Sequence, residues 1–95
     1  MSKKRGRLQI IHDILNAIKL KGGTIKPTHL LYKSNLSHQM MNDYLKELMG
    51  KDFVTEHIAP KNNAKTYSLT KKGYDYLAEY RTVIKFVESF GLEED

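Results

Sequence analysis

The side chains best suited to do chemistry lie in one stretch between residues 37 and 46. Ser37, His38, Gln39, Asn42 and Lys46 fall on one face of a helix, opposite a line of apolar residues. Gln and Asn can pair bidentately with an adenine edge in the major groove of DNA, and Lys can reach guanine or a phosphate. The stretch therefore predicts a DNA-reading surface. The alternative is an ordinary solvent-facing side of a helix.

Positive charge is concentrated on both sides of that stretch. The chain has 16 Lys and Arg against 11 Asp and Glu, a formal net charge of +5. Residues 1–35 contribute eight bases and one acid, and residues 61–72 contribute four lysines and no acid. Because Asp43 on the reading face repels phosphate, the attraction to DNA has to come from these flanks. The expected backbone contacts are Arg5, Arg7, Lys33, Lys61, Asn62, Asn63 and Lys65, and the flexible arm is expected to consist of Lys3, Lys4, Arg5 and Arg7.

The elements that position these residues can be read from apolar spacing. A first helix is indicated by the inward positions Leu8, Ile11, Ile14, Leu15 and Ile18, and it ends at Gly22 and Gly23. Residues 24–25 are extended, and a short second helix covers residues 29–33 after a proline. Ser37 is expected to cap a third helix. The predicted inward residues of that helix are Met41, Tyr44, Leu45 and Leu48, with Met40 packing at the rim of the core.

A hairpin and a long final helix follow the third helix. Strands are predicted from Phe53 to Ile58 and from Thr66 to Leu69, joined by a loop rich in Pro, Asn and Lys. Thr70 is expected to cap a last helix that runs to about Phe90. Two short helices joined by a tight turn and followed by a hairpin predict a winged helix-turn-helix, which is a mainly α member of the α+β class.

The last helix has more apolar surface than one small core can cover. The spacing of its apolar residues matches a coiled-coil seam, and the distal half is expected to project past the domain. We therefore predict a homodimer through this helix. The alternative is that the helix folds back on its own domain. The predicted contacts are Leu77, Tyr80, Val83, Ile84, Val87 and Phe90.

Several function classes have no support in the sequence. There is no cysteine, the histidines do not have the spacing of metal ligands, and no phosphate-binding glycine loop is present. We therefore expect no enzyme activity, metal, cofactor or small-molecule ligand. No apolar run is long enough to span a bilayer, so the expected location is the cytoplasm, in association with the nucleoid.

Two sequence blocks support a family resemblance. LLYKSNLS (residues 30–37) and YSLTKKG (residues 67–73) lie within a region, residues 7–80, that resembles the small archaeal winged-helix DNA-binding proteins. The resemblance implies a dimeric, cofactor-free regulator or chromatin protein of an archaeon or one of its viruses, joined by a C-terminal antiparallel coiled coil. Asp52 stands where that family usually has Gly, but Asp tolerates the left-handed conformation. The last helix is shorter than in the chromatin proteins.

Together these observations predict a DNA-binding part at residues 1–70 and a dimerisation helix at residues 71–95. The expected function is sequence-related binding of double-stranded DNA by a dimeric transcriptional regulator. Two alternatives stay open: an architectural chromatin protein with little sequence preference, and a winged-helix module that binds another protein.

Overall fold

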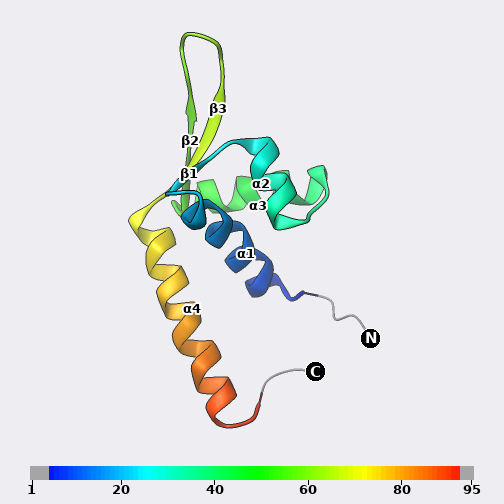
Figure 1. The fold of residues 1–95 in the computed structure, drawn as a ribbon, viewed down its shortest axis with the longest axis vertical. Coiled ribbons are helices and arrows are strands. Elements are labelled where there is room, and N and C mark those ends of the chain that lie inside the picture. The colour runs from blue at the N-terminus through cyan, green and yellow to red at the C-terminus, as the bar shows by residue number, and fades with distance from the viewer. Residues whose placement is uncertain (1–4, 93–95) are drawn as a thin grey trace.

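The computed structural model describes residues 5–92. Lys3 and Lys4 of the predicted flexible arm and the acidic residues 93–95 lie outside the described part, whereas Arg5 and Arg7 of that arm are bound to other residues of the fold. Within it the order is α1 (Arg7–Leu20), β1 (Thr24–Ile25), α2 (Pro27–Ser34), α3 (His38–Gly50), β2 (Val54–Ile58), β3 (Lys65–Leu69) and α4 (Lys71–Ser89) (Figure 1). The predicted mainly helical winged helix-turn-helix is confirmed.

Both predicted helix caps are present. The Ser37 hydroxyl accepts a hydrogen bond from the backbone N–H of Met40 at 3.1 Å, and the Thr70 hydroxyl accepts one from Gly73 at 3.1 Å. These bonds satisfy N–H groups that have no partner inside the first helical turn. At the other end of α2, Asn35 takes the left-handed conformation (φ 55°) and turns the chain toward α3.

The core lies between the three N-terminal helices and the base of the sheet. Leu8 was predicted to point inward, but it is 62% exposed, and Ile10 is buried in its place. The reason is that the buried stripe of α1 advances in steps of four residues, which moves Leu8 off its edge. The buried core side chains are Ile10, Ile11, Ile14, Leu15, Ile18, Ile25, Leu30, Met41, Leu45, Leu48, Val54, Tyr67 and Leu77.

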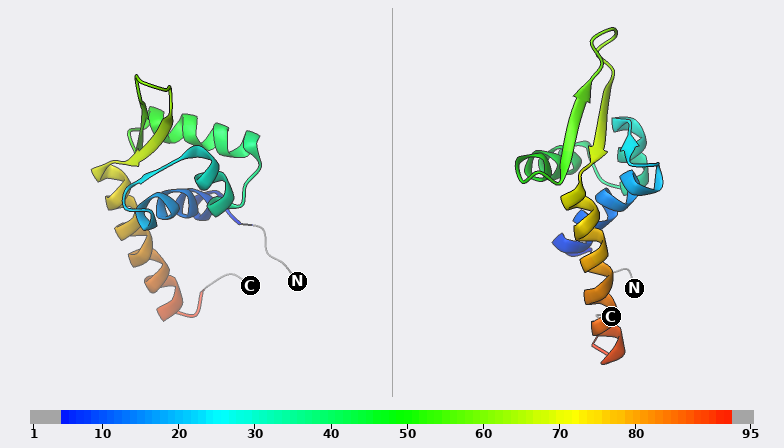
Figure 2. Two further views of the ribbon diagram at one scale, coloured as in Figure 1. Left: turned by 45° about the horizontal axis from the view of Figure 1, so that its top comes forward. Right: turned by 90° about the vertical axis from the view of Figure 1, so that its left-hand side faces the viewer.

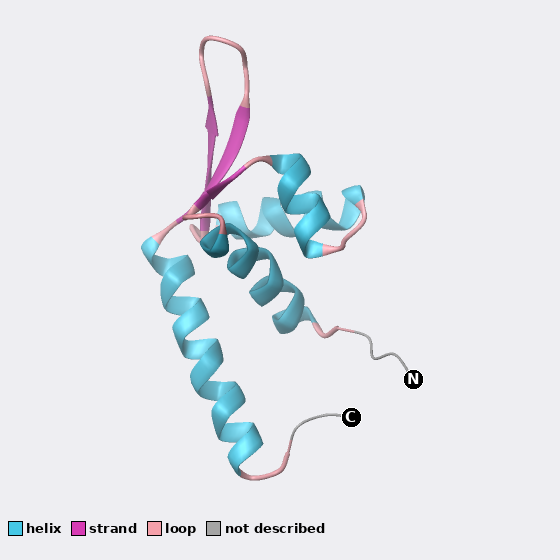
Figure 3. Ribbon diagram, viewed as in Figure 1, coloured by secondary structure: helices cyan, strands magenta, loops and turns pink. Residues whose placement is uncertain are grey.

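The sheet has one strand more than the predicted hairpin. Its order is β1-β3-β2, and both pairs are antiparallel (Figure 3). A short strand was predicted at residues 24–25, but without a partner; it pairs Thr24 with Ser68 and Ile25 with Tyr67. The two hydroxyl groups of Thr24 and Ser68 lie 2.9 Å apart and hydrogen-bond across the strands. β1 therefore fastens the base of the hairpin to the helices, and the rest of the hairpin projects from the body.

The first half of α4 packs on α1, and the second half diverges from it (Figure 2). Leu77 is buried, the Tyr80 ring stacks on His12 with 4.4 Å between centroids, and the Tyr76 hydroxyl donates to the carbonyl of Leu8 at 2.8 Å. Burial raises the pKa of both tyrosines. None of the helices in the described range is long and apolar enough to cross a bilayer.

Candidate nucleic-acid interface

The outer face of α3 presents a row of polar side chains to solvent. His38, Gln39, Asn42 and Lys46 are all exposed, while Met41, Leu45 and Leu48 anchor the opposite face in the core. Predicted residue Ser37 is also exposed, and its hydroxyl is engaged in capping the helix. The amide groups of Gln39 and Asn42 make no hydrogen bond to other described residues. This face can therefore offer its hydrogen-bonding groups to a ligand.

Met40 lies beside that row and differs from its prediction. Packing at the rim of the core was expected, but the side chain is 41% exposed. Met41, Leu45 and Leu48 form the buried stripe of α3, and Met40 lies beside it on the outer side of the helix. Met40 therefore adds an apolar contact surface next to the polar row on α3.

Arg7 makes an ion pair within the protein. Its guanidinium pairs with the carboxylate of Glu47 on α3, which also accepts from Lys51 at 2.9 Å. The hydrogen bonds from Arg7 and then Lys51 lower the pKa of the Glu47 carboxyl. The same side chain stands 5.9 Å from the ring centre of Tyr44, which is half-buried. Arg7 therefore joins the start of α1 to the C-terminal half of α3 and neutralises an acid there.

Arg5 is also held within the fold. Its guanidinium contacts Asp13 on α1 at 3.0 Å and the backbone carbonyl groups of Ser34 and Asn35 at 2.9 and 3.0 Å. Both arginines had been predicted as DNA-backbone contacts from their charge alone. The partners that occupy them are 8 to 40 positions away along the chain, so the local sequence contained no signal of these contacts.

The tip of the hairpin is the most exposed basic feature. The Asn62 side chain accepts the backbone N–H of Ala64 at 3.0 Å, and Asn63 takes the left-handed conformation at φ 58°. These bonds shape the tip and leave the Lys61 side chain in solvent. Lys65, at the start of β3, lies 3.4 Å from the carboxylate of Glu56 on β2. Lys61 is thus the less constrained of the two wing lysines.

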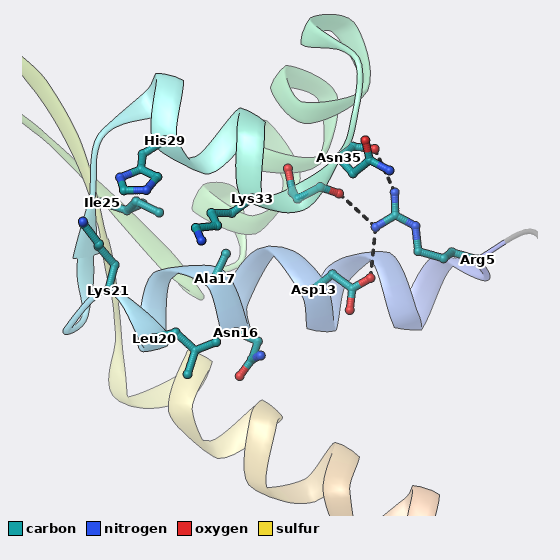
Figure 4. A pocket seen from close by; sticks show the side chains of 11 residues that line it. Arg5, Asp13, Asn16, Ala17, Leu20, Lys21, Ile25, His29, Lys33 and Asn35 are labelled. Carbon is teal, nitrogen blue, oxygen red and sulfur yellow. Dashed lines mark hydrogen bonds and ion pairs between the residues drawn. The ribbon is translucent and has the colours of Figure 1, made fainter.

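The structure places Lys33 away from the α3 face. Its side chain extends from α2 toward Ala17 in a groove between α1 and α2 (Figure 4). The groove has a volume of about 480 Å³ and is open to solvent. Leu20 and Ile25 lie near one end, and the Arg5–Asp13 pair forms the other. The sequence analysis did not foresee this groove, because its two walls are residues 5–21 and 25–35, which meet only in the folded chain.

The predicted dimerisation residues divide into two groups. Leu77 is buried in the core of its own chain and Tyr80 is half-buried against His12, so both support the packing of α4 on α1. Further along, Val83, Ile84 and Phe90 are 56%, 36% and 66% exposed, and Val87 is half-buried. Phe86 packs on Phe90 with 5.0 Å between ring centres. The apolar surface left uncovered is therefore the distal half of α4.

The described polar side chains outside the α3 face and the wing form no further cluster that we single out as a site. Across residues 5–92, no group of three or more His, Asp or Glu side chains is placed to hold a metal ion. Every buried side-chain polar atom in that range has a hydrogen-bond partner. The exposed features are a polar helix face, a basic hairpin tip and an apolar helix end.

The chain matches a known protein family. A family model described as winged helix-turn-helix matches residues 4–88. The chain belongs to the winged helix-turn-helix family. Among curated proteins, MJ0290 of Methanocaldococcus jannaschii is 29% identical over 86 residues, which are 90% of this chain and 37% of that protein. The winged helix-turn-helix described here thus spans about a third of the length of that relative.

Solved structures share the winged helix-turn-helix fold. Sso10a-2, a DNA-binding protein from Sulfolobus solfataricus, has a TM-score of 0.78 at 23% identity, over 90% of this chain and 85% of that one. F93 from STIV, a winged-helix DNA-binding protein, has a TM-score of 0.67 at 20% identity, over 86% and 92% of the chains. The predicted similarity to small archaeal winged-helix DNA-binding proteins is confirmed.

A bacterial regulator has the same fold at lower identity. BpsR of Bordetella bronchiseptica, whose DNA binding is regulated by 6-hydroxynicotinic acid, has a TM-score of 0.73 at 13% identity. The match covers 90% of this chain and 64% of that one. Winged helix-turn-helix proteins with different biological settings thus share this arrangement of helices and wing.

Proposed function

We propose that this protein is a transcriptional regulator that binds double-stranded DNA as a homodimer at the nucleoid. The observation that carries the proposal is the exposed polar face of α3, which is held rigidly by three buried residues and flanked by a basic hairpin. A helix presented in this way fits a major groove, and the hairpin then reaches the neighbouring backbone.

The composition of the α3 face supports reading of sequence. Its central residues, Gln39 and Asn42, are neutral and can pair with adenine, while Asp43 is unfavourable for dense phosphate contact. A surface that only coated DNA would gain more from lysines at these positions. The architectural role is the second candidate, and an equal affinity for all sequences would support it.

Dimerisation is proposed through the distal half of α4. An uncovered apolar surface on a small protein commonly marks an interface. In this proposal residues 1–70 bind DNA and residues 71–95 join the two copies. A two-fold dimer that presents both α3 helices to one side of the duplex would read half-sites about one turn, or ~10 bp, apart.

The test is a DNA titration by fluorescence anisotropy at several salt concentrations. Each phosphate neutralised contributes a slope of about −0.9 to the plot of log affinity against log salt. The double variant Lys61→Ala, Lys65→Ala should reduce the magnitude of this salt slope by about 1 to 2. The matched control is Lys19→Ala with Lys21→Ala, which removes two exposed lysines at the end of α1, outside the wing and the proposed dimer contact. Absence of binding at low salt would refute the proposal.

A further inference from the structure

Arg5, the first residue that the structure describes, reaches the turn between α2 and α3 with its side chain. Arg5 precedes α1, yet its guanidinium contacts α1 at Asp13 and the turn at Ser34 and Asn35 (Figure 4). We propose that Arg5 is a positioning residue that sets the pose of α3, and that it does not itself contact DNA. The proposal rests on the DNA-binding function proposed above and specifies which residue governs its specificity.

The chemistry of the turn explains why a guanidinium fits there. The last carbonyl groups of a helix lack helical partners, and the helix dipole makes this end negative. Arg5 donates to two of these carbonyl groups, from Ser34 and Asn35, and its charge is balanced by Asp13. The planar fork of Arg supplies several donors in fixed directions, which one ammonium group cannot reproduce.

Apart from Arg5, the turn is held by Leu36, which is half-buried and packs against the core. The Ser34 hydroxyl is buried and donates back to the carbonyl of Leu30 at 2.8 Å, so it stabilises α2 and not the link to α3. Asn35 holds the left-handed conformation, and Ser37 begins the cap of α3 two residues later. Only Asn35 and Leu36 separate the end of α2 from that capping residue. A change at Ser34 or Asn35 therefore alters the direction in which α3 leaves the turn.

Two roles of Arg5, positioning α3 or binding a DNA phosphate, predict different effects of its substitution. If Arg5 positions α3, losing it should weaken binding to the preferred site more than binding to random DNA, and the salt slope should stay the same. If Arg5 binds a phosphate, Arg5→Ala should weaken both equally and reduce the slope by about 0.9. Arg5→Lys distinguishes the two roles further, because it keeps the charge and loses the fork.

The experiment measures affinity for a selected site and for random DNA at several salt concentrations. We expect Arg5→Lys and Arg5→Ala each to lower the ratio of these affinities about five- to tenfold, within the range of one ordinary hydrogen bond, with an unchanged slope. Asp13→Asn should give part of the same loss, and combining it with Arg5→Lys should add little. Arg81→Lys is the matched control, since no partner of Arg81 is found within residues 5–92. A normal ratio in Arg5→Lys, or a reduced slope in Arg5→Ala, overturns the proposal.

A second measurement does not depend on DNA. Hydrogen exchange at the backbone amides of residues 35–38 should be faster in Arg5→Ala than in the wild type or in Arg81→Ala, because the turn loses its tie to α1. Unchanged exchange at these amides overturns the positioning role. If the wild type binds no DNA, the proposed function fails, while faster exchange in Arg5→Ala still supports the tie between Arg5 and the turn.

Discussion

At the scale of single residues, a charge count does not tell which cations are available to DNA. Arg5 and Arg7 are held by carboxylates and carbonyl groups of their own chain, and Lys65 has Glu56 as a neighbour. Lys61 and the polar side chains His38, Gln39, Asn42 and Lys46 of α3 are exposed. Some of the cationic side chains counted in the net charge of +5 are therefore already paired within the chain.

Asn42 should be the clearest test of base reading. We expect Asn42→Ala to weaken binding to the preferred site by about 1–3 kcal/mol, the usual worth of one bidentate base contact. Affinity for random DNA and the salt slope should not change, since no charge is removed. Competition titrations would measure the affinities for the preferred site and for random DNA, with Gln9→Ala on the exposed side of α1 as the control. An equal loss on both kinds of DNA would contradict base reading.

At the scale of elements, the junction between β3 and α4 is the most tightly packed backbone. Gly73 is buried in the first turn of α4, and a Cβ atom there would lie 2.7 Å from the carbonyl oxygen of Phe53 and 2.5 Å from a methyl group of Leu69. The Leu69 side chain can move, but the Phe53 carbonyl belongs to the backbone. Close packing at this position holds α4 against the start of β2.

Gly73→Ala should therefore destabilise the fold. We expect a loss of about 1–3 kcal/mol, the typical cost of overpacking a well-packed site, visible as a lower urea midpoint. Gly50→Ala is the control, because nothing lies within 4 Å of its added Cβ. That change should be neutral or stabilising by up to about 1 kcal/mol, since Ala favours helix. Equal midpoints for the two variants would show that the junction can relax.

The elements were predictable where local spacing decides them. Apolar periodicity and the caps at Ser37 and Thr70 predicted all four helices, and the loop composition predicted the hairpin. The pairing of β1 with β3 was not predictable, because a two-residue strand has no periodicity and its partner lies 44 residues away. The Arg7–Glu47 pair spans 40 positions and was missed for the same reason. The sequence predicted which polar side chains of α3 point to solvent. That these side chains contact DNA stays a prediction.

At the scale of the whole molecule, the wing and the distal half of α4 lie at opposite ends (Figure 1). The body extends 52 × 30 × 22 Å, with the hairpin projecting at one end and the distal half of α4 at the other (Figure 1). Large apolar side chains are exposed at the α4 end, from Val83 to Leu92. A partner bound there leaves the α3 face and the wing free, which is what a dimer that binds DNA requires.

Ile84→Asp should disrupt the proposed dimer without unfolding the chain. Ile84 is 36% exposed, so a carboxylate there stays hydrated in a monomer but is buried in an apolar interface. Sedimentation equilibrium should give about twice 11.0 kDa for the wild type and 11.0 kDa for the variant. Thr82→Asp, two residues earlier on the same exposed helix, should keep the wild-type mass. An unchanged mass in Ile84→Asp would leave dimerisation through α4 unsupported.

The single residue between β3 and α4 fixes where the wing and the last helix meet. Thr70 alone joins the strand to the helix, and its hydroxyl donates to the carbonyl of Asp52 at 2.7 Å, which ties the start of β2 to the same point. Both neighbours of this junction are anchored on the body, because β3 pairs with β1 and the first half of α4 packs on α1. α4 is about 28 Å long at 1.5 Å per residue, so its exposed apolar end lies far from the junction. A copy of the chain bound at that end is therefore kept at a distance from the wing.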